Sequence, residues 1–582
     1  MDFITFCEKI NLQSSVIEDV SKVIELNQVK YQKYVDDLTN PIIAEDTYRK
    51  IEYLFKDDVF NVNVLSIYLL AAMQTYNKYL QIGIAENIFI DTMKCFTRFI
   101  SEAKIKTGTY YFDRGFWTHK QTSMLLFRIG ELEYELIKEP ENIINIHIPS
   151  DAKLSKLSIE YSLYCCREFL KVYYPNFDNS RFECESWLLS LELKKYLPQN
   201  SNILLFQEYF DIKHVVLDSN EFIEWLFKTN DNNIEKFKEE TSLQRKVKKA
   251  LLNGEKIGHA FGVLKKNVFK HILFPQGRNL KVLQLADLHF GIEGKDWHND
   301  KVSRTIEFMN DMINTISPDV IVCSGDNVLS TGVLELKKFI ELIDQYKIPW
   351  LFVYGNHEAE YNMTGFSKKE LAEILRNSSS KYLIYADEYV ESGYENRYGN
   401  YCVPVLDEET KKVIGSFIVL DSGQYDYELK AYQTITSGQI LWHSKLLNNL
   451  EDVNENMSTV IFSHMQLPEF QELYLKALDD ETKFVIKQDL TEEEIKSMKY
   501  DGPLNSNGFF EQIRDSRMVK AYLVGHAHTL KFQIKEKNTI FGFAPQTGFS
   551  KLFKNNDLKR KSYYYELTKN FDIKTYEYQE KE

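Results

Sequence analysis

The sequence predicts an α/β protein built from at least two domains. At 582 residues and 68.6 kDa the chain is too long for one ordinary hydrophobic core. Residues 1–110 carry apolar residues at helical spacing, and residues 281–582 alternate short apolar strands with amphipathic helices. Both patterns occur in residues 111–265. We therefore expect a helical segment, an α+β domain and a layered α/β domain, in that order, with a linker at residues 266–280.

In the first half of the chain, helical and strand patterns follow one another. Apolar residues before residue 110 recur at the spacing of helices that pack on a core. Further along, alternating runs indicate strands, and one long amphipathic run indicates a helix. Helices are expected at residues 16–35, 62–83 and 153–174, and strands at 124–137, 142–149 and 181–190.

In the second half, strands and helices alternate, and additional strands come late. Such a pattern fits two mixed sheets that pack face to face with helices outside. The charged helical stretch 469–500 is expected either to cover the rim of a site or to form a solvated insertion. Helices are expected at residues 301–316 and 334–346, and late strands at 401–407 and 413–422.

Five apolar strands of the second half end in residues of the metal-ligand type. Because alternation along a strand puts residues i and i+2 on the same side, the D-x-H and H-x-H pairs are expected to converge. Carboxylate, amide and imidazole ligands fit two divalent cations that share one carboxylate, and they suit manganese, iron or zinc better than calcium. The strand ends are KVLQLADLHFG with Asp287 and His289, VIVCSGDN with Asp326, WLFVYGNHE with Asn356 and His357, TVIFSHMQ with His464, and AYLVGHAH with His526 and His528.

This ordered set resembles the calcineurin-like metallophosphoesterase family, from Lys281 to near the C-terminus. The resemblance implies a phosphoester hydrolase that uses a hydroxide bridging two divalent metal ions. It places His357 near the leaving-group oxygen. A first metal would be held by Asp287, His289, Asp326 and His528, and a second by Asp326, Asn356, His464 and His526, with Asp326 bridging.

One departure from a related group concerns the residues after Asp326. Purple acid phosphatases have a tyrosine ligand a few residues beyond this aspartate, whereas here Asn327, Val328 and Leu329 follow it. The departure argues against a coloured ferric site.

The substrate is left open by the sequence. The same metal set serves phosphatases acting on proteins or small molecules and phosphodiesterases or nucleases. A net charge of −14 opposes loose binding to nucleic acid. The 36 Tyr and 38 Phe are explained by core filling, with a stacking surface for bases as the alternative. Trp297, His298, His443 and Gln466 are candidates for contact with the site, against an ordinary surface or packing role.

The first half resembles the GNAT-like acyltransferase domains of bacteria over residues 1–265. The motifs are FRIGELEYEL, INIHIPSDAKLS, FECESWLLSLELKKYLPQNSNILLFQ and TSLQRKVKKALLNGEKIG. The resemblance implies that the loop after INIHIP cradles the pyrophosphate of an acyl-CoA. Here the loop 149–153 has no glycine and carries Asp151 where an anion would sit. An acyl-CoA-dependent acyltransferase with an accessory phosphoesterase, and a module that recruits a partner, are the alternative functions.

Four residues of this half are candidates for catalysis. Cys184, Ser186 and Trp187 lie on FECESWLL, and His147 alternates with apolar neighbours in INIHIP. The competing interpretation is a packed strand and a hydrogen-bonded structural histidine.

Composition favours a cytoplasmic protein. The seven cysteines have no CxxC pair or regular spacing, which is typical of reduced thiols. The N-terminus lacks a basic start followed by an apolar core, and the longest apolar stretch, 62–73, is too short to span a bilayer. The oligomeric state is not indicated.

Overall fold

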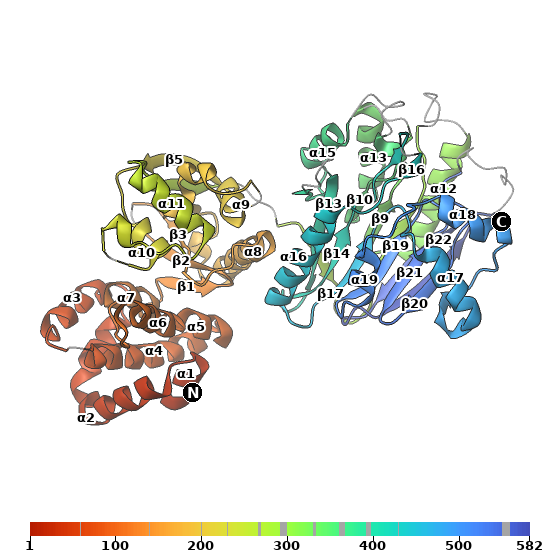
Figure 1. The fold of residues 1–582 in the computed structure, drawn as a ribbon. Helices are drawn as coiled ribbons and strands as arrows, with labels where there is room; N and C mark the ends of the chain where they lie inside the picture. The colour runs from red at the N-terminus through yellow and green to blue at the C-terminus, as the bar shows by residue number, and fades with distance from the viewer. Residues whose placement is uncertain are drawn as a thin grey trace. The chain divides into compact units, whose positions relative to one another are not determined.

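The computed structural model describes residues 1–582 except 59, 139, 200, 230, 266–268, 292–299, 330–332, 360–366, 391–396, 429, 550–558 and 582. The chain divides into two compact units, Met1–Phe269 and Lys270–Glu582 (Figure 1). No helix in the described part of the chain is long and apolar enough to cross a membrane.

Among its described residues, the first unit begins with seven helices, as the helical spacing predicts. The expected helices at 16–35 and 62–83 are present as α2 and α4, and α4 ends at Gly83, whose φ of 84° suits a residue without a Cβ. The helices are α1 (Phe3–Lys9), α2 (Ser14–Leu38), α3 (Ala44–Leu54), α4 (Val62–Ile82), α5 (Glu86–Met93), α6 (Cys95–Thr107) and α7 (Gly115–Thr122).

A six-stranded sheet with the order β1-β2-β3-β4-β6-β5 completes the first unit. The stretch 124–137, expected as one strand, is a hairpin, because Gly130 at φ 66° reverses the chain. The strands are β1 (Leu126–Ile129), β2 (Leu132–Ile137), β3 (Ile143–His147), β4 (Arg181–Ser186), β5 (Phe210–Val216) and β6 (His259–Leu264). The helices are α8 (Lys156–Tyr173), α9 (Asn202–Glu208), α10 (Phe222–Phe227) and α11 (Ser242–Leu252).

The second unit contains two large mixed sheets, which confirms the predicted fold class. One has the order β11-β10-β9-β8-β22-β23, and the other has β12-β13-β14-β17-β19-β21-β20-β18 with β7 beside β13. The strands of the first sheet are β8 (Leu280–Leu285), β9 (Val320–Ser324), β10 (Trp350–Val353), β11 (Leu383–Ile384), β22 (Lys561–Leu567) and β23 (Ile573–Gln579). Those of the second are β7 (Ile272–Phe274), β12 (Glu388–Val390), β13 (Arg397–Asp407), β14 (Val413–Val419), β17 (Ser458–Phe462), β18 (Phe484–Ile486), β19 (Val519–Val524), β20 (Gln533–Glu536) and β21 (Thr539–Phe543).

Helices and a small hairpin accompany these sheets. The helices are α12 (Asp300–Ile316), α13 (Val333–Asp344), α15 (Lys368–Arg376), α16 (Ser437–Val453), α17 (Phe470–Asp479), α18 (Glu492–Tyr500) and α19 (Phe509–Arg514). Strands β15 (Tyr425–Asp426) and β16 (Ala431–Tyr432) pair antiparallel.

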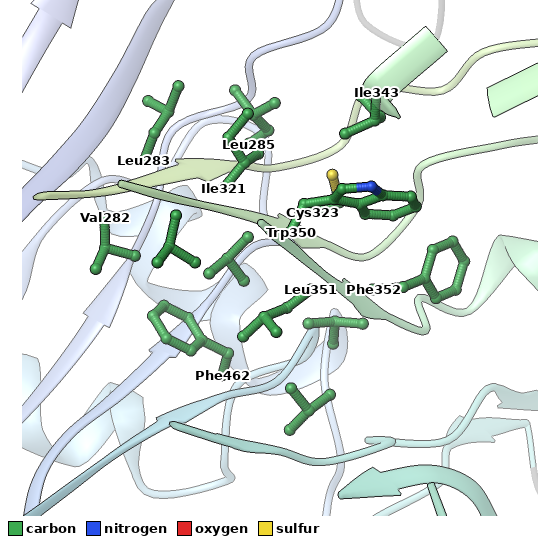
Figure 2. Close-up of a cluster of buried hydrophobic side chains, with 14 of the residues drawn as sticks. Val282, Leu283, Leu285, Ile321, Cys323, Ile343, Trp350, Leu351, Phe352 and Phe462 are labelled. Atoms are coloured by element: carbon green, nitrogen blue, oxygen red, sulfur yellow. The ribbon is translucent and has the colours of Figure 1, made fainter. Parts of the chain in front are cut away.

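The core of the second unit lies between the two sheets. Figure 2 shows side chains from β8, β9 and β10 gathered with Phe462 of β17, which belongs to the opposite sheet. On the other face of β10, Trp350 and Phe352 contact Phe339 of α13 edge-on. Strands buried on both faces must be apolar throughout, which explains runs such as VIVCS and WLFV.

The expected linker at residues 266–280 and the charged stretch 469–500 both include parts of the second sheet. Strand β7 lies inside the expected linker and pairs with β13, so residues from Lys270 onward belong to the second unit. Strand β18 lies inside 469–500 and pairs with β20. The charged stretch is therefore a structural part of the sheet edge and not only a solvated insertion.

Candidate metal centre

The expected ligands follow strands that end at one edge of each sheet. Asp287, Asp326 and Asn356 follow β8, β9 and β10, which are parallel neighbours. His464 and His526 follow β17 and β19, which are parallel neighbours in the other sheet. Because parallel strands present their carboxyl ends at the same edge, these side chains are brought together.

The ligands form two groups, and within each group the candidate ligand atoms lie within 4.8 Å of one another. In the first group, His528 Nε2 lies 3.2 Å from Asp287 Oδ1 and 3.0 Å from His289 Nε2. In the second, His464 Nε2 lies 3.3 Å from Asp326 Oδ2. The groups are Asp287, His289 and His528, and Asp326, His464 and His526.

Asp326 faces both groups. Its Oδ2 lies 3.3 Å from His464 Nε2 and 4.0 Å from His289 Nε2. Asn356 joins the second group, with its Oδ1 3.2 Å from His464 Nε2. A carboxylate between two sets of nitrogen ligands has the position that a ligand shared by two cations requires.

The burial of one carboxylate oxygen of Asp287 independently indicates that these residues suit a divalent cation. Asp287 Oδ1 is buried and has no hydrogen-bond donor in good geometry among the described residues. Burying a carboxylate oxygen without a donor costs free energy, which a cation at this point would recover. Ring nitrogens of His528 and His289 lie 3.2 and 3.9 Å from this oxygen.

Two hydrogen bonds orient the imidazole rings. His464 Nδ1 lies 3.0 Å from the carbonyl oxygen of Ser324, so Nδ1 carries the proton and Nε2 is left for a cation. His526 Nε2 lies 2.8 Å from the carbonyl oxygen of Asp501, which leaves Nδ1 of that ring. Asp501 directly follows α18 and lies one residue beyond the charged stretch 469–500.

The backbone at the ligands is left-handed. Strand β8 ends at Leu285 and β19 at Val524, so the D-x-H and H-x-H pairs lie beyond their strands and strand alternation does not explain their convergence. Instead, φ is 54° at Asp287, 51° at His289, 49° at Asp326 and 66° at His526. Such conformations cost about 1–3 kcal/mol each in a side-chain-bearing residue, and they cluster at functional sites.

A glycine precedes three of the ligands because a Cβ would not fit. A Cβ at Gly325 would lie 2.3 Å from His464 Nδ1, and one at Gly355 would lie 2.1 Å from Asp326 Oδ1. At Gly525 it would lie 2.9 Å from Asp287 Oδ2. The Gly-Asp, Gly-Asn and Gly-His dipeptides of the motifs are therefore required for backbone and ligand to approach closely.

Burial and mutual charge set the protonation states. Burial lowers the pKa of His289 to about 3 and that of His526 to about 4, so both rings are neutral at neutral pH and can offer a lone pair. Burial alone would raise the pKa of Asp326, but His464 and His357 hold it well below its usual value. Burial opposes the charge on His464, yet Asp326 raises its pKa to about 9.

Family comparisons agree with this geometry. The family model described as calcineurin-like phosphoesterase matches residues 280–530. These residues form a calcineurin-like phosphoesterase domain. In the first unit, the N-acyltransferase N-terminal domain model matches residues 1–124 and the GNAT-like C-terminal domain model matches 126–264. Both resemblances noted in the sequence are thereby confirmed.

Known relatives of the phosphoesterase domain include phosphatases. Phosphatase DCR2 of Saccharomyces cerevisiae is 25% identical over 281 residues, which cover 44% of this chain and 46% of that protein. Probable inactive purple acid phosphatase 29 of Arabidopsis thaliana is 26% identical over 303 residues, 47% of this chain and 73% of that protein. The chain thus spans about half the length of the yeast relative. The first unit is similar to an acyltransferase in complex with decanoyl-CoA and teicoplanin, with 17% identity, a TM-score of 0.35, and coverage of 46% of this chain and 99% of that one.

Glu358 is a residue of the phosphoesterase domain that sequence reasoning missed. Its buried carboxylate accepts hydrogen bonds from the backbone N–H groups of Gly355 at 2.7 Å and Asn327 at 2.5 Å. It therefore ties together the two loops that present Asn356 and Asp326. Burial and the charge of Asp326 raise the pKa of Glu358 to about 7. The one signal in the sequence was the last letter of GNHE.

His357 lies beside Asp326 in the phosphoesterase centre. Its backbone N–H donates to Asp326 Oδ1 at 2.9 Å, and its Nε2 lies 3.7 Å from Asp326 Oδ2. The side chain is 26% exposed, whereas those of His289 and His464 are fully buried. His357 is thus more accessible to a bound molecule than these two histidines.

The other candidates near the centre have structural partners or lie outside the described residues. His443 is buried on α16, where its Nδ1 lies 2.8 Å from Gln512 Nε2 and burial lowers its pKa to about 3. Gln466 Nε2 donates to the carbonyl oxygen of Asp501 at 3.1 Å, which supports the same turn that holds His526. Trp297 and His298 lie outside the described residues.

The catalytic candidates of the first unit are buried or make structural contacts. Cys184 is fully buried on β4, and burial raises the pKa of its thiol far above the usual value. Ser186 accepts the backbone N–H of Leu188 at 3.1 Å, and Trp187 packs beside a small apolar cluster around Leu193. His147 Nε2 lies 2.8 Å from Glu135 Oε2, the hydrogen-bonded arrangement that the structural interpretation expects.

Proposed function

We propose that the phosphoesterase domain hydrolyses phosphoesters with two divalent cations that share Asp326. The observation that supports it best is the pair of neighbouring ligand groups, each with a buried aspartate. Asp326 belongs to the second group, and its Oδ2 also lies 4.0 Å from His289 Nε2 of the first. The first cation would be held by Asp287, His289, Asp326 and His528, and the second by Asp326, Asn356, His464 and His526.

In this proposal, the cations supply the nucleophile and the charge neutralisation, and protein side chains supply the proton and the positioning. Two such cations, held by these residues, would supply a hydroxide nucleophile near neutral pH and would offset the charge on the phosphate oxygens. His357, held next to Asp326 through its backbone, is proposed to donate a proton to the leaving oxygen. Glu358 keeps the loops of Asp326 and Asn356 in register and has no contact with substrate in this proposal.

The test is hydrolysis of an aryl phosphate monoester and the matching diester, with added manganese and with chelator. Asp326→Asn is expected to abolish the metal-dependent turnover and lower the metal content measured by elemental analysis. Asp311→Asn, an aspartate on α12 whose partners are Tyr578 and Lys581, is the matched control and should retain both. Full metal-dependent turnover in Asp326→Asn would rule the proposal out, and the ratio of monoester to diester rates separates phosphatase from nuclease-like chemistry.

A second candidate function belongs to the first unit. The matches of the two acyltransferase-type family models extend over nearly all of it, which favours transfer of an acyl group from acyl-CoA. Asp151 of the loop expected to cradle the pyrophosphate is paired with Arg128 at 2.8 Å, which opposes an anion at that point. Thermal stabilisation of the whole protein by acetyl-CoA would support acyl transfer, and no shift at high concentration would count against it.

A further inference from the structure

The loop that carries His526 and His528 is less buried than the aspartates of the phosphoesterase centre. Asp287, Asp326 and His464 are buried, whereas His526, Ala527 and His528 are only partly buried. Side chains packed against this loop are therefore candidates for contact with the part of a substrate that lies outside the phosphate.

A row of aromatic rings runs outward from this loop. The Tyr432 ring contacts the His526 ring edge-on, with centroids 4.9 Å apart. Tyr425 contacts Tyr432 in the same way at 5.1 Å, and Tyr427 contacts Tyr425 at 5.2 Å. At the outer end of the row, Tyr427 is 60% exposed. The row therefore connects a candidate ligand of the centre to a solvent-exposed ring.

The hairpin formed by β15 and β16, which carries these rings, is fixed by hydrogen bonds and a β-bridge to neighbouring segments. Strands β15 and β16 are closed by Gln433 N–H, which donates to Gln424 O at 3.0 Å, and Tyr432 forms a bridge with Pro503. At the base, the buried Lys368 ammonium donates to Asp421 Oδ1 at 2.6 Å and to Gly423 O at 3.3 Å. An anchored hairpin presents its rings without an ordering cost at the moment of binding.

We infer that Tyr425, Tyr427 and Tyr432 form a stacking surface for a planar ring, so that the domain acts on small phosphoesters whose alcohol carries an aromatic or heteroaromatic ring. The inference rests on the proposed hydrolysis, because the row begins at a ligand of the proposed metal centre. A ring stacks on tyrosine irrespective of its hydrogen-bonding pattern, which makes the surface selective for shape and not for one compound. The net charge of −14 favours a small ester over a polynucleotide.

The test compares adenosine monophosphate with ribose phosphate esterified at the same oxygen, which lacks only the base. In the wild type, kcat/KM should be higher for the nucleotide. In Tyr427→Ala the nucleotide KM should rise by about fivefold or more, as for loss of one base-stacking ring, with kcat little changed. The ratio of kcat/KM for the nucleotide to kcat/KM for the ribose phosphate then falls towards one. Tyr427→Phe keeps the ring and should keep the ratio.

The matched control is Tyr53→Ala, a tyrosine of the first unit that is 73% exposed, and it should leave both substrates unchanged. Equal kcat/KM for the two substrates in the wild type, or a ratio unaffected by Tyr427→Ala, would overturn the inference. If neither is hydrolysed with metal present, the hydrolase proposal fails separately. In that case, the dissociation constants of the two compounds are measured by calorimetry. The ratio of these constants should favour the nucleotide in the wild type and in Tyr427→Phe, and should fall towards one in Tyr427→Ala.

Discussion

The carboxylates of Asp151 in the first unit and Asp287 in the second have opposite surroundings. Asp151 is 53% exposed and accepts two hydrogen bonds from Arg128 Nη1 at 2.8 and 2.9 Å, with Arg98 Nη1 3.5 Å away. Asp287 is buried and faces imidazole nitrogens, and among the described residues it has no lysine or arginine partner. The first loop has its negative charge neutralised by the chain itself, whereas the second leaves a buried charge for a cation. Cation binding is therefore expected at Asp287, whose negative charge is not neutralised by a lysine or arginine among the described residues, and not at Asp151.

The largest expected difference is between the same Asp-to-Asn substitution at Asp287 and at Asp151. Asp287→Asn should lower turnover and reduce the bound metal, by more than the roughly 10-fold to 100-fold loss that follows removal of a supporting partner of a metal ligand. Asp151→Asn should change neither, because its carboxylate serves only an ion pair near the surface. Turnover and elemental analysis of both variants check the comparison, and a loss of metal in Asp151→Asn would break it.

His357→Ala should lower kcat by about 100-fold to 10,000-fold with both metals retained, since the group removed is a proton donor and not a ligand. His214→Ala, an exposed histidine on β5 of the first unit, is the control and should have no effect. Metal content separates the roles: if His357→Ala loses metal, this histidine is structural.

Gly355→Ala tests the close approach at the centre with one methyl group. Its Cβ would lie 2.1 Å from Asp326 Oδ1, so metal affinity and the midpoint of thermal unfolding should both fall. At Gly254 of the first unit, φ is +80° and nothing lies within 4 Å of an added Cβ. Gly254→Ala should therefore cost only the left-handed strain, about 1–2 kcal/mol, and should leave metal binding unchanged. Equal metal affinity in the two variants would refute the steric explanation.

The smallest expected effect is a pH dependence of the metal-free protein. The pKa of His464 is raised to about 9 from 6.5, so the folded protein binds this proton more tightly than the unfolded chain does. The resulting stability is present below pH 6.5 and is lost as pH rises through about 9. Thermal unfolding followed from pH 6.5 to 9 in chelator should show a falling midpoint. Manganese, which displaces that proton, should flatten the profile, and an identical slope with and without metal would contradict the assignment.

The sequence predicted the second unit more fully than the first for a physical reason. Ligands such as Asp326 and Asn356 directly follow buried strands, and where a parallel strand ends is visible in a local apolar run. Contacts made by backbone atoms of distant loops leave no such pattern. The carbonyl oxygen of Asp501 that orients His526, and the N–H groups that Glu358 binds, could not be foreseen from residue types.

The first unit shows where local reasoning was wrong. Residues 124–137 read as strand because an apolar run precedes Gly130 and alternating residues follow it, yet the glycine adopts φ 66° and makes a hairpin. The pairs Asp287 with His289 and His526 with His528 were expected to converge by alternation within strands. They converge through left-handed loops beyond the strand ends, a conformation that residue spacing does not reveal.

The left-handed backbone at Asp287, His289, Asp326 and His526 has a consequence for how fast the centre takes up metal. If the metal-free protein keeps these torsion angles, an arriving cation has no loop to order. Uptake should then be governed by the rate at which each cation sheds its own hydration water, and cations of equal charge should load in the order of their water-exchange rates.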